Sequence, residues 1–232
     1  MPDVSRLENG KASNMNKYYC ALCTDHYCRS GEVEKTTLNC PCNDDDIESI
    51  KELYQEEENF NLAYHSALTE AEGYGNKTRL EEIMDFAKKC GFSRLGIAFC
   101  LGLSKEANTL CKILRHNSFE VVSVICKNGS IPKEFLNISQ EQKLRPNTYE
   151  PMCNPIGQAK LLNKAETELN IILGLCVGHD SLFIKYSEAP VTVFAVKDRV
   201  LAHNPLGALY LCDSYYKNRL FGNTNGSNGD KK

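Results

Sequence analysis

Four short apolar runs in the second half of the chain constrain its fold most. They occupy residues 95–99, 121–125, 169–175 and 191–196. Segments with helical spacing separate them, and one begins with a capping box formed by Thr78 and Glu81. Wholly apolar strands that alternate with helices are typical of a parallel sheet covered on both faces. The sequence therefore predicts an α/β fold, a Rossmann-like three-layer sandwich with a mostly parallel sheet, over residues 77–221.

Polar residues mark the expected starts of three helices in this region. Ser104 is expected to cap the helix after the first strand. Asn154 and Pro155 predict a helix with an N-cap followed by proline at its first position. Asn204 and Pro205 repeat that device and predict a final helix that runs to about residue 220.

The first 76 residues have a different character. Residues 1–17 are polar and lack periodicity, which predicts a disordered lead-in. Residues 18–43 form a short cysteine-rich knot that is too small to build an apolar core. Three aspartates, 44–46, then predict the start of a long helix that reaches about residue 71, in a connecting segment over 44–76. Residues 222–232 are expected to be a flexible tail.

Composition narrows the class of protein. The chain has 232 residues, enough for one core and a small appended module. A net charge of −3 argues against binding to nucleic acid or to an anionic membrane surface. No apolar run approaches the roughly 20 residues of a membrane span, and the N-terminus lacks the apolar core of a signal peptide. We therefore expect a cytoplasmic protein that acts away from membranes.

Twelve cysteines are the most unusual feature of the composition. Thiols stay reduced in the cytoplasm, so an abundance of them there indicates metal binding. Secretion with a disulfide framework is the alternative, but it requires a targeting signal that the sequence does not display.

The first cysteine group lies in the knot and has the spacing C-x2-C-x4-C-x11-C. Its members are Cys20, Cys23, Cys28 and Cys40. Zinc and iron–sulfur clusters both accept four thiolates, so the ligand type favours metal without selecting one. Cys42 lies close by, and His26 is a possible substitute ligand, although a histidine facing solvent is the commoner arrangement.

The second group is tied to the predicted sheet. Cys100, Cys126 and Cys176 directly follow the first three strands, and Cys153 precedes the helix that begins at Pro155. Parallel strands end at one edge of a sheet, which is where open α/β sheets bind their ligands. We therefore expect the four thiols to converge there.

Packing is the alternative explanation for any single cysteine, because cysteine is often a small buried residue. It accounts well for three members of the set at helix-core spacing, namely Cys90, Cys111 and Cys212. It accounts less well for three cysteines that all terminate strands.

A glycine-containing turn follows the third strand. Gly174, Gly178 and Ser181 lie in it, and a short helix is expected to begin near Asp180. The glycines permit a tight turn, and the helix start is expected to offer amide donors to an anion or to cluster sulfides. One glycine pair is a weak phosphate-loop signal, so nucleotide binding is not supported.

Charged and protonatable residues are expected at the same edge. The catalytic candidates are His179, Asp180, Lys197, Asp198, Arg199 and His203. An imidazole such as that of His179 is able to ligate a metal or move protons near neutral pH. The alternatives are hydrogen-bonded structural histidines and a solvated ion-pair loop over residues 197–199.

Five stretches together resemble a known family. They are GIAFC–GL (96–103), VVSVICK (121–127), EPMCNPIGQAKLLN (150–163), GLCVGHDSLF (174–183) and VKDRVLAHNPLGALY (196–210). Across residues 18–221 the chain resembles an uncharacterised family of predicted metal-binding proteins, domain of unknown function 1847. The resemblance implies metal ligation by the eight cysteines of the two groups. Cys42 departs from the family pattern, which has methionine there, so the fourth ligand of the knot is Cys40 or Cys42. The resemblance implies no reaction.

Three functions remain open. The first is an iron–sulfur protein with two four-cysteine sites, 4Fe-4S in type, that serves a redox partner or a small-molecule ligand. The second is a zinc-binding structural or binding module. The third is a metal-free enzyme with Cys153 or Cys176 as nucleophile beside His179.

Overall fold

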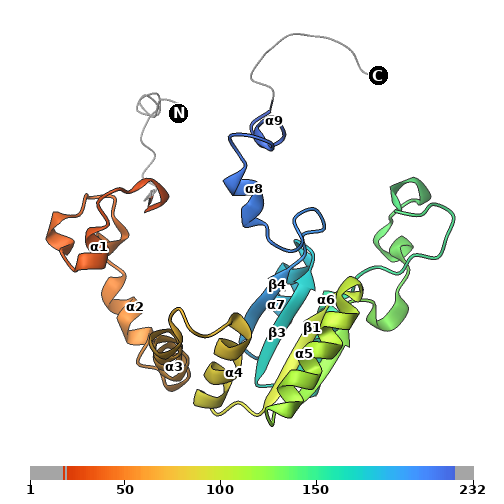
Figure 1. The fold of residues 1–232 in the computed structure, drawn as a ribbon, viewed down its shortest axis with the longest axis horizontal. Coiled ribbons are helices and arrows are strands. Elements are labelled where there is room, and N and C mark those ends of the chain that lie inside the picture. Colours follow the sequence, from red (N-terminus) through yellow and green to blue (C-terminus); the bar gives the residue numbers. More distant parts are fainter. Residues whose placement is uncertain (1–17, 19, 223–232) are drawn as a thin grey trace. The chain divides into compact units, whose positions relative to one another are not determined.

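The computed structural model describes residue 18 and residues 20–222 (Figure 1). The predictions for residues 1–17 and for the tail beyond residue 222 lie outside these described residues. The described residues divide into two compact units, with the boundary between Tyr64 and His65. None of the helices in the described part is both long and apolar enough to cross a membrane.

The first unit is made of short helices and turns. They are η2 (Cys20–Leu22), α1 (Tyr27–Ser30), η3 (Val33–Lys35), η4 (Pro41–Asn43) and α2 (Ile47–Leu53), and α3 (Glu57–Gly73) begins in this unit. None of the elements from η2 to α2 contains a buried residue. Residues 20–53 therefore have little apolar burial to stabilise them. Small segments of this kind commonly depend on a bound metal or on disulfides for their stability.

The expected long helix over residues 44–71 is two helices, α2 and α3, instead of one. The interruption follows Leu53, whose carbonyl accepts a hydrogen bond from Asn59 Nδ2 at 3.0 Å. Tyr54 and Gln55 close tight turns onto Lys51 and Glu52, at 3.2 and 2.9 Å. These contacts take up carbonyls that a continuous helix would use, which ends α2. The aspartates do not cap α2 with a side chain; Asp44 Oδ1 accepts from the Asp46 amide at 3.0 Å instead.

The second unit confirms the predicted α/β class with a parallel sheet. Its strands are β1 (Arg94–Phe99), β2 (Glu120–Ile125), β3 (Leu169–Leu175) and β4 (Val191–Val196). They form one four-stranded sheet in the order β2-β1-β3-β4, and every pair is parallel (Figure 1).

Four helices supply the outer layers of the sandwich. They are α4 (Arg79–Lys89), α5 (Ser104–His116), α6 (Pro155–Lys164) and α7 (His179–Tyr186). One buried cluster joins α4 and α5 to Leu95, Ile97 and Ile171 of the sheet. A second cluster joins α6 and α7 to Ala98 and Ile172. Successive residues of a strand face opposite sides of a sheet, so the helix pairs cover its two faces.

The helix-start predictions have mixed outcomes. Thr78 and Glu81 form the predicted capping box, and Asn154 caps α6 by accepting from the Gly157 amide at 2.9 Å. Ser104 does not cap α5: it is the first helical residue, and its hydroxyl donates to the Leu101 carbonyl at 2.6 Å.

The predicted final helix is also divided, into α8 (Leu206–Tyr210) and α9 (Lys217–Leu220). Pro205 precedes α8, and Asn204 provides no side-chain cap. Between the helices the Leu211 carbonyl accepts from the amides of Ser214 and Tyr216, at 3.1 and 3.0 Å. The Ser214 hydroxyl reaches the same carbonyl at 3.3 Å, a local contact that competes with helix formation.

Strand order determines where a ligand is expected. The connection through α5 leads from β1 to β2 on one side, whereas β3 and β4 lie on the other side of β1. The order therefore reverses between β1 and β3. The crevice beyond the carboxyl ends of these strands is the topological switch point, where open α/β sheets bind their ligands.

Candidate functional site

Three cysteines lie at the carboxyl edge of the sheet, each at the end of a strand. Cys100, Cys126 and Cys176 directly follow β1, β2 and β3. The Cys100 amide donates to the Leu173 carbonyl at 3.1 Å, and the Cys126 amide donates to the Phe99 carbonyl at 2.9 Å. Parallel pairing thus continues to Cys100 and Cys126, and Cys176 directly follows β3, so the three residues lie at the edge where the sequence predicts them.

Cys153 reaches the same edge because the chain returns there before α6. The Asn154 amide donates to the Cys126 carbonyl at 2.7 Å. Asn128 Nδ2 donates to the carbonyls of Ile125 and Asn154, at 2.9 and 3.0 Å. These bonds tie the end of β2 to the start of α6 and place Cys153 beside Cys126.

A hydrogen-bonded chain of thiols results, with Cys126 in its middle. Cys126 is 2% exposed, and its sulfur accepts from the Leu101 amide at 3.3 Å. Its thiol is within hydrogen-bonding reach of the sulfurs of both Cys100 and Cys153. Because a thiol has one proton, it serves one of these sulfurs at a time. The hydrogen bonds to Cys100 and Cys153, together with burial, raise the pKa of Cys126.

The two thiols that flank Cys126, those of Cys100 and Cys153, have lowered pKa values. The hydrogen bond from Cys126 lowers the pKa of Cys100 to about 5, with help from the Gly102 amide and the Lys197 ammonium group. Hydrogen bonds from Cys126 and His179, and the charge of Lys127, lower the pKa of Cys153 to about 4. The bond to Cys153 in turn raises the pKa of His179. Each group thus favours the charged form of the other, the thiolate of Cys153 and the imidazolium of His179.

Cys176 is linked to this edge by Arg199, which lies in the loop after β4. Arg199 Nη2 donates to Cys176 Sγ at 3.4 Å. This bond, and to a smaller degree the charges of Cys100 and Cys153, raise the pKa of Arg199. One guanidinium group is thus within electrostatic reach of three of the four edge sulfurs.

Gly174 has a structural role in the strand that carries Cys176. Its φ is 69°, and the register jumps from Leu173 opposite Ala195 to Leu175 opposite Val196. Gly174 is therefore the extra residue of a β-bulge, which bends the end of β3. A Cβ atom there would lie 2.2 Å from Leu103 Cδ1, so only glycine fits.

The turn after Cys176 is held by hydrogen bonds among its own residues. Gly178 has a φ of 82° and precedes α7. The amides of His179 and Asp180 donate to the Cys176 carbonyl at 3.0 and 3.2 Å, and the Ser181 amide donates to Asp180 Oδ1 at 2.8 Å. These three amides are the donors that the sequence offered to a ligand, and the chain already uses them.

Two of the catalytic candidates hold the loop after β4 in shape. Asp198 Oδ1 accepts from the amides of Val200 and Leu201 at 2.9 and 2.8 Å. The Asp198 amide donates to His203 Nδ1 at 3.1 Å, and the His203 amide donates to the Asp198 carbonyl at 2.9 Å. Asp198 and His203 are thus structural partners in the loop that presents Lys197 and Arg199.

The sequence prediction omitted Gln158, which supports the edge from α6. Gln158 is fully buried, and its Nε2 donates to the carbonyls of Phe99 and Val124 at 3.2 and 2.7 Å. Its Oε1 has no hydrogen-bond partner among the described residues. The amide joins the ends of β1 and β2 just before their cysteines. The sequence does contain a signal for this buried position. Gln158 lies three residues after Pro155 and four before Leu162, which places it on the apolar face of the helix.

In the first unit the predicted cysteines surround one hollow of about 450 Å³. The cysteines that line it are Cys20, Cys23, Cys28 and Cys40. Cys42 is not part of this lining, but its amide and thiol hydrogen-bond to the Cys40 sulfur. The amide bond is the main reason why the pKa of Cys40 is lowered, and the bond to Cys40 raises the pKa of Cys42.

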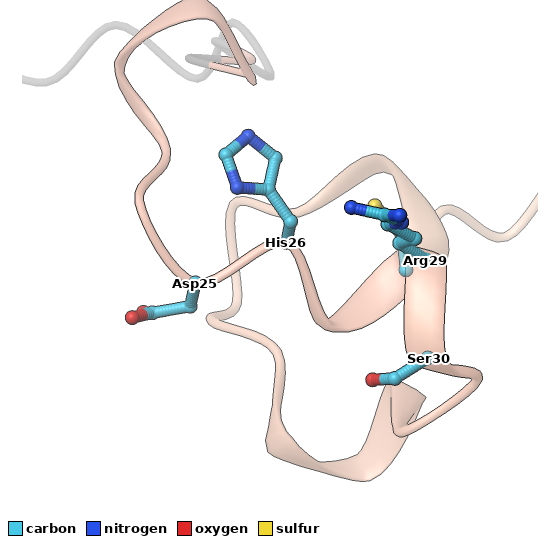
Figure 2. Close-up of a pocket in the computed structure, with 5 residues that line it drawn as sticks. Asp25, His26, Arg29 and Ser30 are labelled. Atoms are coloured by element: carbon cyan, nitrogen blue, oxygen red, sulfur yellow. The ribbon is translucent and has the colours of Figure 1, made fainter.

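A second hollow of the first unit, about 540 Å³, lies around His26. Figure 2 shows its ring with Asp25 and Arg29 on opposite sides and Ser30 further along α1. Cys28 also lines this hollow. His26 has a φ of 52° and its Nδ1 is 3.2 Å from the Thr24 carbonyl oxygen. His26 is therefore near the cysteines but exposed, in a turn of its own.

The donor chemistry at both places suits thiophilic metals, because reduced thiols are the soft ligands that zinc and iron–sulfur clusters take. Within residues 20–222, no three His, Cys, Asp or Glu side chains form a group that could hold a metal ion. Cys111 is buried in the core as predicted, whereas Cys90 and Cys212 are only partly buried. Cys212 lies in the turn between α8 and α9 rather than on a helix.

Comparisons with known proteins place the chain among uncharacterised relatives. It is 47% identical over 201 residues to "Uncharacterized protein MJ0455" of Methanocaldococcus jannaschii, which covers 87% of this chain and 97% of the relative. No solved structure matches the chain. Residues 40–194 match the family described as "Protein of unknown function (DUF1847)". The chain belongs to this family of proteins of unknown function.

Proposed function

We propose that the chain is a metal-binding protein whose edge thiols hold an iron–sulfur cluster, 4Fe-4S in type. The observation that carries the proposal is that Cys100, Cys126 and Cys153 pack in one cluster at the carboxyl edge. Cys176 joins the same edge through Arg199. Four thiolates are the usual ligand set of such clusters. A bound cluster would supply electron transfer, or a Lewis-acid iron for a small molecule if one ligand position is exchangeable.

The surrounding residues suit a redox role. The Leu101 amide and Arg199 already donate to the sulfurs of Cys126 and Cys176. Hydrogen bonds to ligand sulfurs and nearby positive charge stabilise a reduced cluster and so raise its potential. We further propose that the protein works in the reducing cytoplasm, where thiols stay available, with a redox partner or a small-molecule ligand.

A second metal site is proposed in the knot, with Cys20, Cys23, Cys28 and Cys40 as ligands. It is supported by the hollow that these four thiols line and by the absence of buried residues in the elements from η2 to α2. Metal binding is a common source of stability for such small segments. Zinc is the alternative metal here and at the edge.

Metal analysis of anaerobically purified protein tests the proposal. We expect iron and acid-labile sulfide, with a broad visible absorption that bleaches on reduction. Cys100→Ser and Cys153→Ser should each remove the iron of one cluster, whereas Cys111→Ser, in the core, should retain both. Stoichiometric zinc without sulfide would favour the zinc protein. Protein that contains no metal as purified and takes up none on reconstitution would contradict metal binding.

One observation favours a second function, the pairing of Cys153 with His179. A thiolate next to an imidazolium is the arrangement of cysteine nucleophiles. In metal-free protein, iodoacetamide should then alkylate Cys153 well before Cys111, and His179→Gln should slow that reaction. Equal labelling rates for the two cysteines would argue against a nucleophile.

A further inference from the structure

Three permanent cations lie at the carboxyl edge without a carboxylate partner. They are Lys127, Lys197 and Arg199, which follow β2 and β4. None of the ion pairs found among residues 20–222 includes any of the three. The nearby carboxylates of Asp180 and Asp198 accept from backbone amides of their own turns. The carboxyl edge therefore has more positive charge than is needed to balance the negative charge of its thiolates.

The Lys197 ammonium group lies over the switch point itself. Lys197 Nζ is 3.5 Å from the position that a Cβ atom of Gly102 would occupy, and 3.6 Å from the corresponding position at Gly174. Cys100 Sγ is 4.0 Å from the same Gly102 position. The Lys197 ammonium group and the Cys100 thiol thus both border the space that Gly102, just after β1, leaves without a side chain, whereas Leu103 fills the corresponding space at Gly174.

Arg199 has hydrogen-bonding capacity left. A guanidinium group has five N–H donors in a planar fork, a geometry that matches carboxylate and phosphate. Within the described residues, the side chain of Arg199 hydrogen-bonds to Cys176 Sγ, and the residue is exposed. The remaining donors are open to a ligand at the end of β3.

We propose that Lys197 and Arg199 bind a small oxyanion, a carboxylate or phosphate group of a substrate, next to the sulfurs of Cys100 and Cys176. The proposal rests on the proposed function, because it names the substrate class of the same edge site. Lys197 supplies a point charge over Gly102, and Arg199 supplies paired donors. The oxyanion positions the rest of the ligand beside whatever the thiols hold.

Gly102 gives this proposal a sharp steric test. An alanine methyl group there would be in ordinary van der Waals contact with Lys197 Nζ and Cys100 Sγ. The substitution therefore fills the space between ammonium and thiol without a steric clash. Gly102→Ala should block the oxyanion while leaving both charges in place.

Calorimetric titration with inorganic phosphate and with succinate, on metal-free and on reconstituted protein, tests the proposal. We expect saturable binding of at least one probe by wild-type protein; which probe binds distinguishes phosphate from carboxylate. Lys197→Gln, Arg199→Gln and Gly102→Ala should each weaken it at least about tenfold. The matched control is Lys164→Gln, which removes a charge from the last turn of α6.

Several results would overturn the proposal. One is the lack of saturable binding of either probe, and another is unchanged affinity in the Lys197 and Arg199 variants. A third is an equal loss of affinity in Lys164→Gln, because that would indicate general ionic attraction. Iron and sulfide are measured on the same samples. Cluster-loaded protein that binds neither probe refutes this proposal alone, whereas probe binding by protein that never takes up iron supports it and refutes the cluster.

Discussion

Arg199 Nη2 donates to the sulfur of Cys176 at 3.4 Å, joining the loop after β4 to the end of β3. These two residues are 23 positions apart in the chain. The contact places a permanent positive charge at the strand end next to the switch point. Hydrogen-bonded sulfur is a weaker electron donor than free thiolate, so Arg199 would tune a metal held by Cys176.

Gly174 and Gly178 offer a test of the bulge at the end of β3. Both have positive φ, so alanine at either position costs about 1–3 kcal/mol of backbone strain. At Gly174 the new Cβ atom also meets Leu103 Cδ1 at 2.2 Å, whereas at Gly178 nothing lies within 4 Å. Gly174→Ala should therefore lower the free energy of unfolding more than Gly178→Ala in urea titrations. Equal losses would show that the bulge tolerates a side chain.

Gln158 should contribute to stability through the strand ends that it joins. In Gln158→Leu the part-buried carbonyl of Val124 loses the donor at 2.7 Å. Loss of a hydrogen bond to such a group costs about 1 kcal/mol, so the free energy of unfolding should fall by about that amount. A change below about 0.5 kcal/mol, the usual range for surface substitutions, would show that the amide is dispensable.

Glu168, which bonds to the residues at the start of β1, should make the free energy of unfolding depend on pH in the acidic range. Its carboxylate accepts from the amides of Arg94 and Ser93, both at 2.7 Å, and these bonds lower its pKa below the usual 4.5. The carboxylate therefore binds protons less readily in the folded chain than in the unfolded one. Its contribution to stability is complete above about pH 4.5 and is lost as the pH falls through the folded pKa.

The matched variant is Glu168→Gln. Its deficit in unfolding free energy relative to wild type should be largest at neutral pH and should shrink below pH 4.5. A deficit that stays constant from neutral to acidic pH would contradict the role given to the charge.

Cys23 is a proposed ligand of the knot, so Cys23→Ser should lower the metal content and leave the sheet intact. Residues 20–53 have little buried surface, so loss of a metal should raise amide hydrogen exchange there. Exchange in β1 and β3 should not change, because their core contains no residue of the knot. Unchanged metal content in this variant would remove Cys23 from the ligand set.

Much of the sheet could be predicted from the sequence because its signals are local. Short, predominantly apolar runs indicate all four strands, and Asn154 with Pro155 indicates the start of α6. Parallel pairing then followed from the alternation of strand and helix. The position of three cysteines at one edge is a direct consequence of that geometry.

The errors arose where a side chain competes with the backbone in a way that sequence spacing does not reveal. Asn59 takes the Leu53 carbonyl and interrupts the expected long helix, and Ser214 does the same at Leu211. Gly174 was interpreted as part of a ligand-binding turn, but it is a bulge residue whose role depends on the packing of Leu103. The first two contacts are local but compete closely with helix formation, so spacing alone does not predict them, and the contact of Gly174 with Leu103 depends on tertiary structure.

Anomalous diffraction at the iron absorption edge, from crystals of anaerobically purified protein, tests the central claim most directly. The account predicts a strong iron peak at the carboxyl edge, bonded to the sulfurs of Cys100, Cys126, Cys153 and Cys176. Those four sulfurs without bound iron, with any iron peak confined to the knot, would contradict it.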